Sequence, residues 1–251
     1  TPAELIRAIL RAPVDLLWNG GIGTYVKASS ESHADVGDKA NDVVRVDGAE
    51  IRAKCVGEGG NLGFTQLGRI EYAHHGGRIN TDFIDNSAGV DTSDHEVNIK
   101  ILLDQQVRDG DLTTKQRGEL LTATTEPVAE LVLADNYAQN VALQNSAFIG
   151  QAMLHVHTDW IRRLEKLGLL DRDLEFLPTA KQLRDRQAAG GSLTTPELAV
   201  LLAYTKIMLS SEVLESDLLD DPYLRTELVE YFPDPIRERF EAKLSSHPLR
   251  R

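Results

Sequence analysis

Cysteine, long apolar runs and an excess of basic residues are all missing from this 251-residue sequence. Cys55 is the only cysteine, which excludes an intramolecular disulfide and a zinc site built mainly from cysteine. No apolar stretch approaches the roughly 20 residues of a membrane-spanning helix, and no secretory signal opens the sequence. The net charge of −12 argues against nucleic acid and anionic membranes as partners, because both attract basic surfaces. We therefore expect a protein of the reducing cytoplasm.

Several motifs of catalysis and metal binding are also missing. The sequence contains no G-x-G-x-x-G or G-x-x-x-x-G-K-[ST] phosphate loop and no G-x-S-x-G nucleophile turn. It has no pair of histidines four residues apart, and the acids between 82 and 96 do not have the spacing of a calcium-binding loop. No metal ligand is therefore predicted. The remaining composition, 41% hydrophobic and 26% charged, is typical of a soluble globular protein of one or two domains.

The first residues, TPAELIRAILRAP, predict a helix with Thr1 as its N-cap, Pro2 at its first position and Glu4 closing a capping box. The sequence has no initiator Met and ends in SSHPLRR. We therefore expect it to be a piece of a longer polypeptide.

Glycine is concentrated before residue 92, and this divides the sequence into two unlike parts. The first part, 1–92, predicts a helix over 65–76 and three strands, the last of them weak, over 13–18, 50–57 and 76–80. The order of helix, strand, loop, strand, helix and strand is typical of an α/β doubly wound sheet. We expect 1–92 to be the C-terminal half of a Rossmann-like domain, with a long and partly helical loop over 26–48.

The second part, 93–251, predicts a mainly α-helical region. Ser93 and Glu96 have the spacing of a capping box and predict a helix over 93–110. A long helix or a broken pair is expected over 124–168, with Pro127 in its first turn, and a buried helix over 195–214.

Two glycine-rich turns follow predicted strands, WNGGIGTY at 18–25 and GEGGN at 57–61. Ligands of open α/β sheets bind at the carboxyl ends of the strands, and glycine lets the backbone approach a ligand closely. Glu58 and Asn61 would then lie at the mouth of the sheet, although Asn61 could also cap the following helix. The residues alone leave open whether these are cofactor-facing turns or ordinary ends of strands.

The stretch DFIDNSAGVDTSDHE at 82–96 combines a turn with the predicted start of a helix. A helix N-terminus offers free N–H groups to an anion, and the Ser93 hydroxyl would be a further donor. The capping box explains Ser93 without any ligand, and the two interpretations are compatible.

Taken in order, three segments resemble the very large NAD-specific glutamate dehydrogenases of bacteria: PVDLLWNGGIGTYVKAS, GEGGNLGFTQLGRIEYA and GGRINTDFIDNSAGVDTSDHEVNIKILL. The resemblance covers 13–103 closely, and the helical remainder, with TPELAVLLAYTK, is similar to that family's segment after the dinucleotide domain. It implies NAD as cofactor and oxidative deamination of L-glutamate to 2-oxoglutarate and ammonium.

Looser resemblance to the smaller glutamate dehydrogenases implies roles for individual residues. Asn61 would lie near the nicotinamide ribose, and Asn86 would contact the nicotinamide side of the cofactor. Val90 and Ser93 would line the pocket for the side-chain carboxylate of the substrate. The other residues implied at the cofactor edge are Asn19, Gly20, Gly21 and Gly60. The turn at 19–21 departs from the usual Pro-Ala-Ala type of that family.

The same resemblance assigns no catalytic residue to this sequence, because the family's catalytic lysine and aspartate belong to an upstream domain. The expected partners are L-glutamate or 2-oxoglutarate, the rest of the same polypeptide, and further copies in a homo-oligomer. The 251-residue chain is expected to be inactive alone, since amino-group deprotonation needs groups it lacks.

Two alternatives remain open. A related amino-acid dehydrogenase of the same fold could act on a branched or aromatic substrate, and Ser93 argues against it because an apolar pocket has no use for a hydroxyl. Residues 110–251 could instead form a helical oligomerisation or regulatory module without chemistry.

Overall fold

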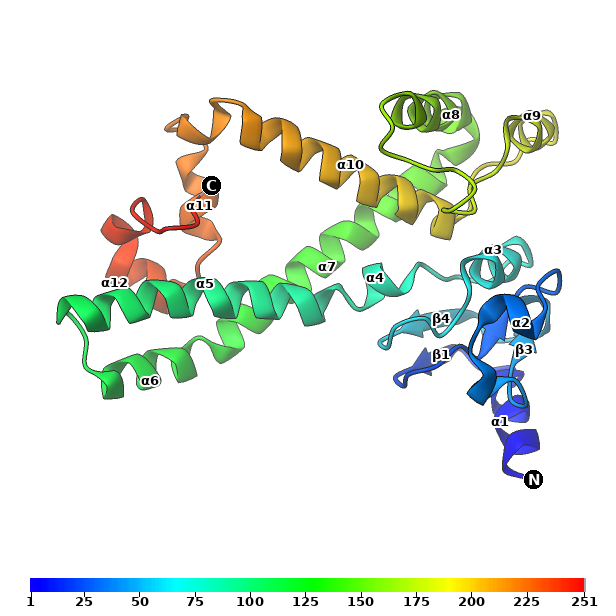
Figure 1. Cartoon of the computed structure of the whole chain (residues 1–251), viewed down its shortest axis with the longest axis horizontal. Coiled ribbons are helices and arrows are strands. Elements are labelled where there is room, and N and C mark those ends of the chain that lie inside the picture. The colour runs from blue at the N-terminus through cyan, green and yellow to red at the C-terminus, as the bar shows by residue number, and fades with distance from the viewer. Residues whose placement is uncertain (251) are drawn as a thin grey trace. The chain divides into compact units, whose positions relative to one another are not determined.

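A computed structural model describes residues 1–250 as a mainly helical chain with a small parallel β-structure (Figure 1). Its contacts form two compact units. The first unit consists of Thr1–Asn86 with Gln139–Lys206, and the second of Ser87–Ala138 with Ile207–Arg251. No helix within residues 1–250 is both long enough and apolar enough to cross a membrane.

This grouping does not follow the predicted division at residue 92. The first unit ends its N-terminal part at Asn86 and adds Gln139–Lys206 from the helical half of the chain. Helices α7 (Thr125–Phe148) and α10 (Thr195–Glu215) therefore continue from one unit into the other. The assignment of 1–92 to a nucleotide-binding domain stays a prediction.

Strands β1 (Leu16–Asn19) and β4 (Cys55–Glu58) pair in parallel, with Trp18 opposite Gly57. Helix α1 (Pro2–Leu10) precedes β1 and has the predicted Thr1 capping box. The predicted strands over 13–18 and 50–57 are confirmed in order and direction, although both extend later in the sequence than expected. The cause is local, since a 3₁₀ turn, η2 (Gly48–Glu50), occupies the beginning of the second range.

The weak third strand, predicted over 76–80, is present as a single parallel bridge between Cys55 and Arg78. The Val56 amide donates to the Arg78 carbonyl over 2.9 Å, and the Arg78 amide donates to the Lys54 carbonyl over 3.2 Å. These hydrogen bonds place Arg78 beside strand β4. The three predicted segments therefore share one parallel arrangement.

A second parallel pair joins β2 (Val26–Lys27) to β3 (Val46–Asp47). Between them lie α2 (His33–Val36) and the 3₁₀ turn η1 (Lys39–Asn41), so the 26–48 segment is partly helical as predicted. Helix α3 (Gln66–His74) follows β4. The apolar core of this region contains Val26, Val46, Ile51, Ala53, Val56, Phe64, Tyr72 and Ile79.

The first unit also contains helices from later in the chain. Helix α4 (Asp82–Asp85) precedes the unit boundary, and α8 (Gly150–Lys166) and α9 (Ala180–Ala188) follow α7. The predicted 124–168 segment is thus a broken pair, α7 and α8.

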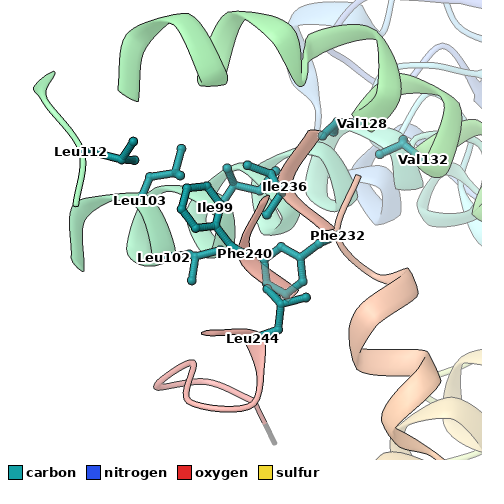
Figure 2. Packing of buried hydrophobic residues seen from close by; sticks show 10 residues of the cluster. All are labelled: Ile99, Leu102, Leu103, Leu112, Val128, Val132, Phe232, Ile236, Phe240 and Leu244. Carbon is teal, nitrogen blue, oxygen red and sulfur yellow. The ribbon is translucent and has the colours of Figure 1, made fainter. Parts of the chain in front are cut away.

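Among its described residues, the second unit has helices as its only regular secondary structure. It contains α5 (Ser87–Asp109), α6 (Thr114–Ala123), the 3₁₀ turn η3 (Leu218–Asp220), α11 (Arg225–Glu230) and α12 (Asp234–Leu244). Figure 2 shows its core, in which side chains from α5, α7 and α12 meet. The buried residues are Ile99, Leu102, Leu103, Leu112, Val128, Val132, Phe232, Ile236, Phe240 and Leu244.

The predicted helix start at Ser93 is wrong. Helix α5 begins six residues earlier, at Ser87, so Ser93 lies within the helix and does not cap it. The Asn136 amide donates to the Ser87 hydroxyl over 2.9 Å, which ties the true start of α5 to α7. The Glu96 carboxylate pairs with Lys100 one turn later. The Asn-Ser-Ala-Gly segment, 86–89, was predicted to be a turn, but a helix tolerates Ser and Gly when tertiary contacts hold it.

Candidate functional site

The turns that follow β1 and β4 lie against each other. The Gly60 amide donates to the Asn19 carbonyl over 3.0 Å. A Cβ atom on Gly60 would collide with the Gly21 carbonyl, so only glycine allows this approach. The structure therefore brings together four of the predicted cofactor residues, Asn19, Gly20, Gly21 and Gly60, at the carboxyl ends of two parallel strands.

Asn61 and Asn86 are also brought together. The Asn86 side-chain amide donates to the Asn61 Oδ1 atom over 3.0 Å. Asn86 is the residue that ends α4, and Asn61 is exposed and directly follows Gly60. All six predicted cofactor residues thus belong to one local region of the first unit.

The glycines of the 57–63 loop are explained by packing against β1. Trp18 lies across the loop, and a Cβ atom on Gly57 would lie 2.7 Å from its ring, with a closer collision at Gly59. A Cβ atom on Gly63 would collide with the Asn19 side chain. The density of glycine therefore lets the two turns pack closely. It does not by itself identify a phosphate site.

Glu58 forms a buried ion pair with Arg69 from helix α3. The guanidinium donates from Nε to Oε2 over 2.6 Å and from Nη2 to Oε1 over 3.0 Å. Oε1 also accepts the Phe64 amide over 3.0 Å. The Glu58 side chain is 0% exposed and that of Arg69 is 5% exposed, so the pair is removed from water. It anchors both ends of the glycine loop to α3.

Two aspartates of α4 complete this network. The Asp85 carboxylate accepts the Glu58 amide over 2.9 Å, and the Asp82 carboxylate accepts the Leu62 amide over 2.7 Å. Asp82 also lies 3.3 Å from the Arg69 guanidinium. These backbone contacts hold the loop in its strained form, in which the non-glycine Leu62 has a φ of 61°.

Burial dominates the electrostatics of this network. Desolvation raises the pKa of Glu58, and the hydrogen bonds and charge of Arg69 oppose that shift. Desolvation also raises the pKa of Asp85, against the bond from the Glu58 amide. For Arg69, desolvation lowers the pKa, but its bonds to Glu58 outweigh this and leave it raised. The buried Arg69 guanidinium therefore interacts electrostatically with three carboxylates, those of Glu58, Asp82 and Asp85.

The position of Glu58 corrects an expectation, because it does not face the mouth of the sheet. It is buried and supports the loop from behind, while Asn61 remains at the surface. Arg69 was missed, although an arginine next to Ile70 on the apolar face of a predicted helix was an available signal. Such a residue needs a buried anion, and the nearby acidic loop residue supplies it.

Asn19 carries a buried side-chain amide without a hydrogen-bond partner among residues 1–250. Its Oδ1 accepts the Gly21 amide at 3.4 Å, a long bond that fixes the side chain in the turn. A buried donor of this kind normally finds an acceptor. It is therefore an orphaned polar atom of this region that a bound group could satisfy.

The predicted substrate residues belong to the second unit. Val90 and Ser93 are both on α5, and Val90 is 77% exposed. Ser93 is exposed as well, with its hydroxyl in the second turn of the helix. Both side chains are accessible on this helix.

Comparison with known proteins identifies the family. Residues 1–146 match the family described as bacterial NAD-glutamate dehydrogenase, catalytic domain, and residues 190–251 match the glutamate dehydrogenase C-terminal family. The first match alone covers more than half of the chain. The chain therefore belongs to the bacterial NAD-glutamate dehydrogenases.

Similar proteins carry the same description over the whole chain. The NAD-specific glutamate dehydrogenases of Pseudomonas aeruginosa and Mycobacterium tuberculosis are each 54% identical over 250 residues. That of Halomonas elongata is 50% identical over 251 residues. In each case all of this chain is covered, but it spans only 15–16% of the length of the relative.

Proposed function

We propose that this chain forms one wall of the active-site cleft of an NAD-specific glutamate dehydrogenase. The observation that carries the proposal is that the turns after β1 and β4, which contain Asn19, Gly20, Gly21, Gly60 and Asn61, lie against each other, with Asn86 hydrogen-bonded to Asn61. Family membership and the names of the relatives support NAD as the cofactor and glutamate as the substrate.

In this proposal, the parallel pair and the bridge at Arg78 are the C-terminal half of a Rossmann-like sheet. Strand β1 has a partner on one side only among the described residues, and its Leu16 and Trp18 side chains are 55% and 60% exposed. An open apolar edge of this kind requires a cover. The rest of the same polypeptide, which is far longer in the relatives, would supply it.

The residues present fit the nicotinamide end of NAD better than its phosphates. The exposed Asn61–Asn86 pair offers amide groups, the kind of donor and acceptor that a carboxamide recognises. The orphaned Asn19 amide is a further donor. Arg69 is already saturated by Glu58 and Asp82, so it is not available to a phosphate. When bound, NAD supplies the hydride acceptor of the reaction.

Helix α5 would carry the residues that bind the substrate. The Ser93 hydroxyl would donate to the side-chain carboxylate of L-glutamate, and Val90 would pack against its methylene groups. The products are 2-oxoglutarate, ammonium and NADH, and the proton transfers use groups in the rest of the polypeptide. A related dehydrogenase for apolar amino acids is disfavoured, because the relatives are described as glutamate enzymes. We further propose a cytoplasmic homo-oligomer.

Steady-state kinetics of the full-length protein tests this assignment. Asn61→Ala and Asn86→Ala are each expected to raise KM for NAD by about tenfold, with little change in KM for glutamate. A tenfold change corresponds to the loss of about one hydrogen bond between uncharged groups. Ser93→Ala is expected to raise KM for glutamate, with little change in KM for NAD. Asn145→Ala, on the exposed face of α7, is the matched control and should change neither. Unaltered KM for NAD in both asparagine variants would refute the proposed wall.

A further inference from the structure

Three potential metal ligands lie close together in the second unit. Asp91 and His95 lie on α5, and Asp135 lies on α7. Their ligand atoms all lie within 4.8 Å of one another. Asp91 and His95 are four residues apart, so they share one face of the helix, with 3.8 Å between the His95 Nε2 atom and the Asp91 carboxylate.

His95 is the unusual member of this cluster. Its side chain is buried, at 3% exposure, yet neither ring nitrogen has a hydrogen-bond partner among residues 1–250. A neutral imidazole has one donor and one acceptor, and leaving both unpaired in the interior is unfavourable. The burial of His95 is therefore unexplained by the protein atoms of this region.

The ring of His95 is held in one orientation. It stacks on Tyr231, with 4.4 Å between the ring centroids and an angle of 21° between the planes. Tyr231 is itself fixed, because its hydroxyl donates to Asp94 over 2.6 Å and accepts from Asn98 over 2.8 Å. A preorganised imidazole is what a metal site requires of its nitrogen ligand.

The two carboxylates repel each other at this site. Burial raises the pKa of Asp91, and the nearby charge of Asp135 raises it further, while His95 opposes the shift. No lysine or arginine pairs with Asp91 or Asp135 in the ion pairs of the described residues. A bound cation would relieve this repulsion and satisfy the imidazole at the same time.

We propose that Asp91, His95 and Asp135 bind one divalent transition-metal ion that joins α5 to α7. One imidazole nitrogen and two carboxylates suit Zn²⁺, Co²⁺ or Mn²⁺, whereas Ca²⁺ takes six to eight oxygen ligands. Three protein ligands leave positions for water. The site follows Val90 directly along α5, so the metal would fix the part of the helix that carries Val90 and Ser93. The metal proposal itself does not depend on the dehydrogenase assignment.

The test is direct metal binding by the 251-residue chain, prepared without a histidine tag and stripped with a chelator. Zn²⁺ is titrated by calorimetry, and Co²⁺ by its visible absorption. We expect one ion per chain, and binding weakened roughly tenfold or more by Asp135→Asn, since even outer partners of metal ligands contribute 10- to 100-fold. Asp135 is exposed, so this variant keeps its fold.

His95→Gln should also weaken binding and should abolish the imidazole contribution to the Co²⁺ spectrum. Glu130→Gln and His155→Gln, both at exposed positions outside the cluster, are the matched controls and should leave the affinity unchanged. Absence of stoichiometric binding would overturn the proposal. Equal affinity in Asp135→Asn and the unaltered chain would overturn it in favour of adventitious binding.

Discussion

Removing the guanidinium of Arg69 is expected to destabilise the first unit severely. Arg69 donates to both carboxylate oxygens of Glu58, over 2.6 and 3.0 Å, and lies 3.3 Å from Asp82. Arg69→Met keeps much of the apolar stem but leaves the Glu58 charge buried without its cation. Losing one partner of a buried pair costs about 3–5 kcal/mol, a large share of the roughly 5–15 kcal/mol that stabilises a typical domain.

Arg162→Met is the matched control. Arg162 pairs with Asp159 over 2.9 Å, but these side chains are 58% and 72% exposed, so the loss should be about 0–1 kcal/mol. Urea unfolding followed by tryptophan fluorescence measures both variants. The two tryptophans, Trp18 and Trp160, lie in the first unit, so the signal reports on that unit.

A second substitution separates the charge effect from a loss of packing. Adding Glu58→Gln to Arg69→Met removes the stranded charge, so the double variant should be less destabilised than the sum of the two single variants. If Arg69→Met unfolds the chain outright, recovery of a folded state in the double variant carries the same information. A cost for Arg69→Met no larger than that for Arg162→Met would refute the reasoning.

Three further predictions follow from the same region. Gly60→Ala should cost about 1–3 kcal/mol in urea unfolding, because the new methyl meets the Gly21 carbonyl, whereas Gly21→Ala enters open space and should stay within about 0.5 kcal/mol. The stability gap between Arg69→Met and the unaltered chain should narrow as pH falls through the raised pKa of Glu58. Burial raises the pKa of Glu58, and the variant lacks the guanidinium that opposes this shift. The folded variant therefore protonates Glu58 at a pH where the unfolded chain still has an ionised carboxylate, which stabilises the folded variant as pH falls. A stability difference that widens in acid would contradict this. The purified 251-residue chain should produce no NADH from glutamate and NAD, and measurable activity would disprove the assignment of catalysis to the rest of the polypeptide.

Much of the first unit was predictable because its signals are local. Apolar runs bounded by glycine predicted strands near 13–18 and 50–57, and the rule for ligand sites in parallel sheets predicted that their turns would meet. The meeting of Asn61 with Asn86 was not predictable from spacing alone. It depends on α4, whose position is set by Asp82 and Asp85 accepting backbone amides from a distant loop.

The predictions that were wrong concern features set by tertiary contacts and not by local sequence signals. Ser93 and Glu96 have the right spacing for a capping box, but α5 starts earlier because Ser87 is held by Asn136, a contact across 49 residues. The grouping of 139–206 with the N-terminal part likewise depends on contacts between residues far apart in sequence, such as the bond from the Gln66 side chain to the Pro196 carbonyl. Glu58 was misplaced because its partner Arg69 is 11 residues away on helix α3, and spacing alone does not show that the two side chains pair. Local patterns predict elements, and tertiary contacts decide their ends and partners.

Hydrogen exchange in the full-length protein, measured with and without NAD, tests whether the turns after β1 and β4 border the cofactor. We expect slower amide exchange on NAD addition in peptides covering 19–25 and 57–64, with no change in α6 as the internal control. Unchanged exchange in both turns, at an NAD concentration that saturates activity, would contradict it.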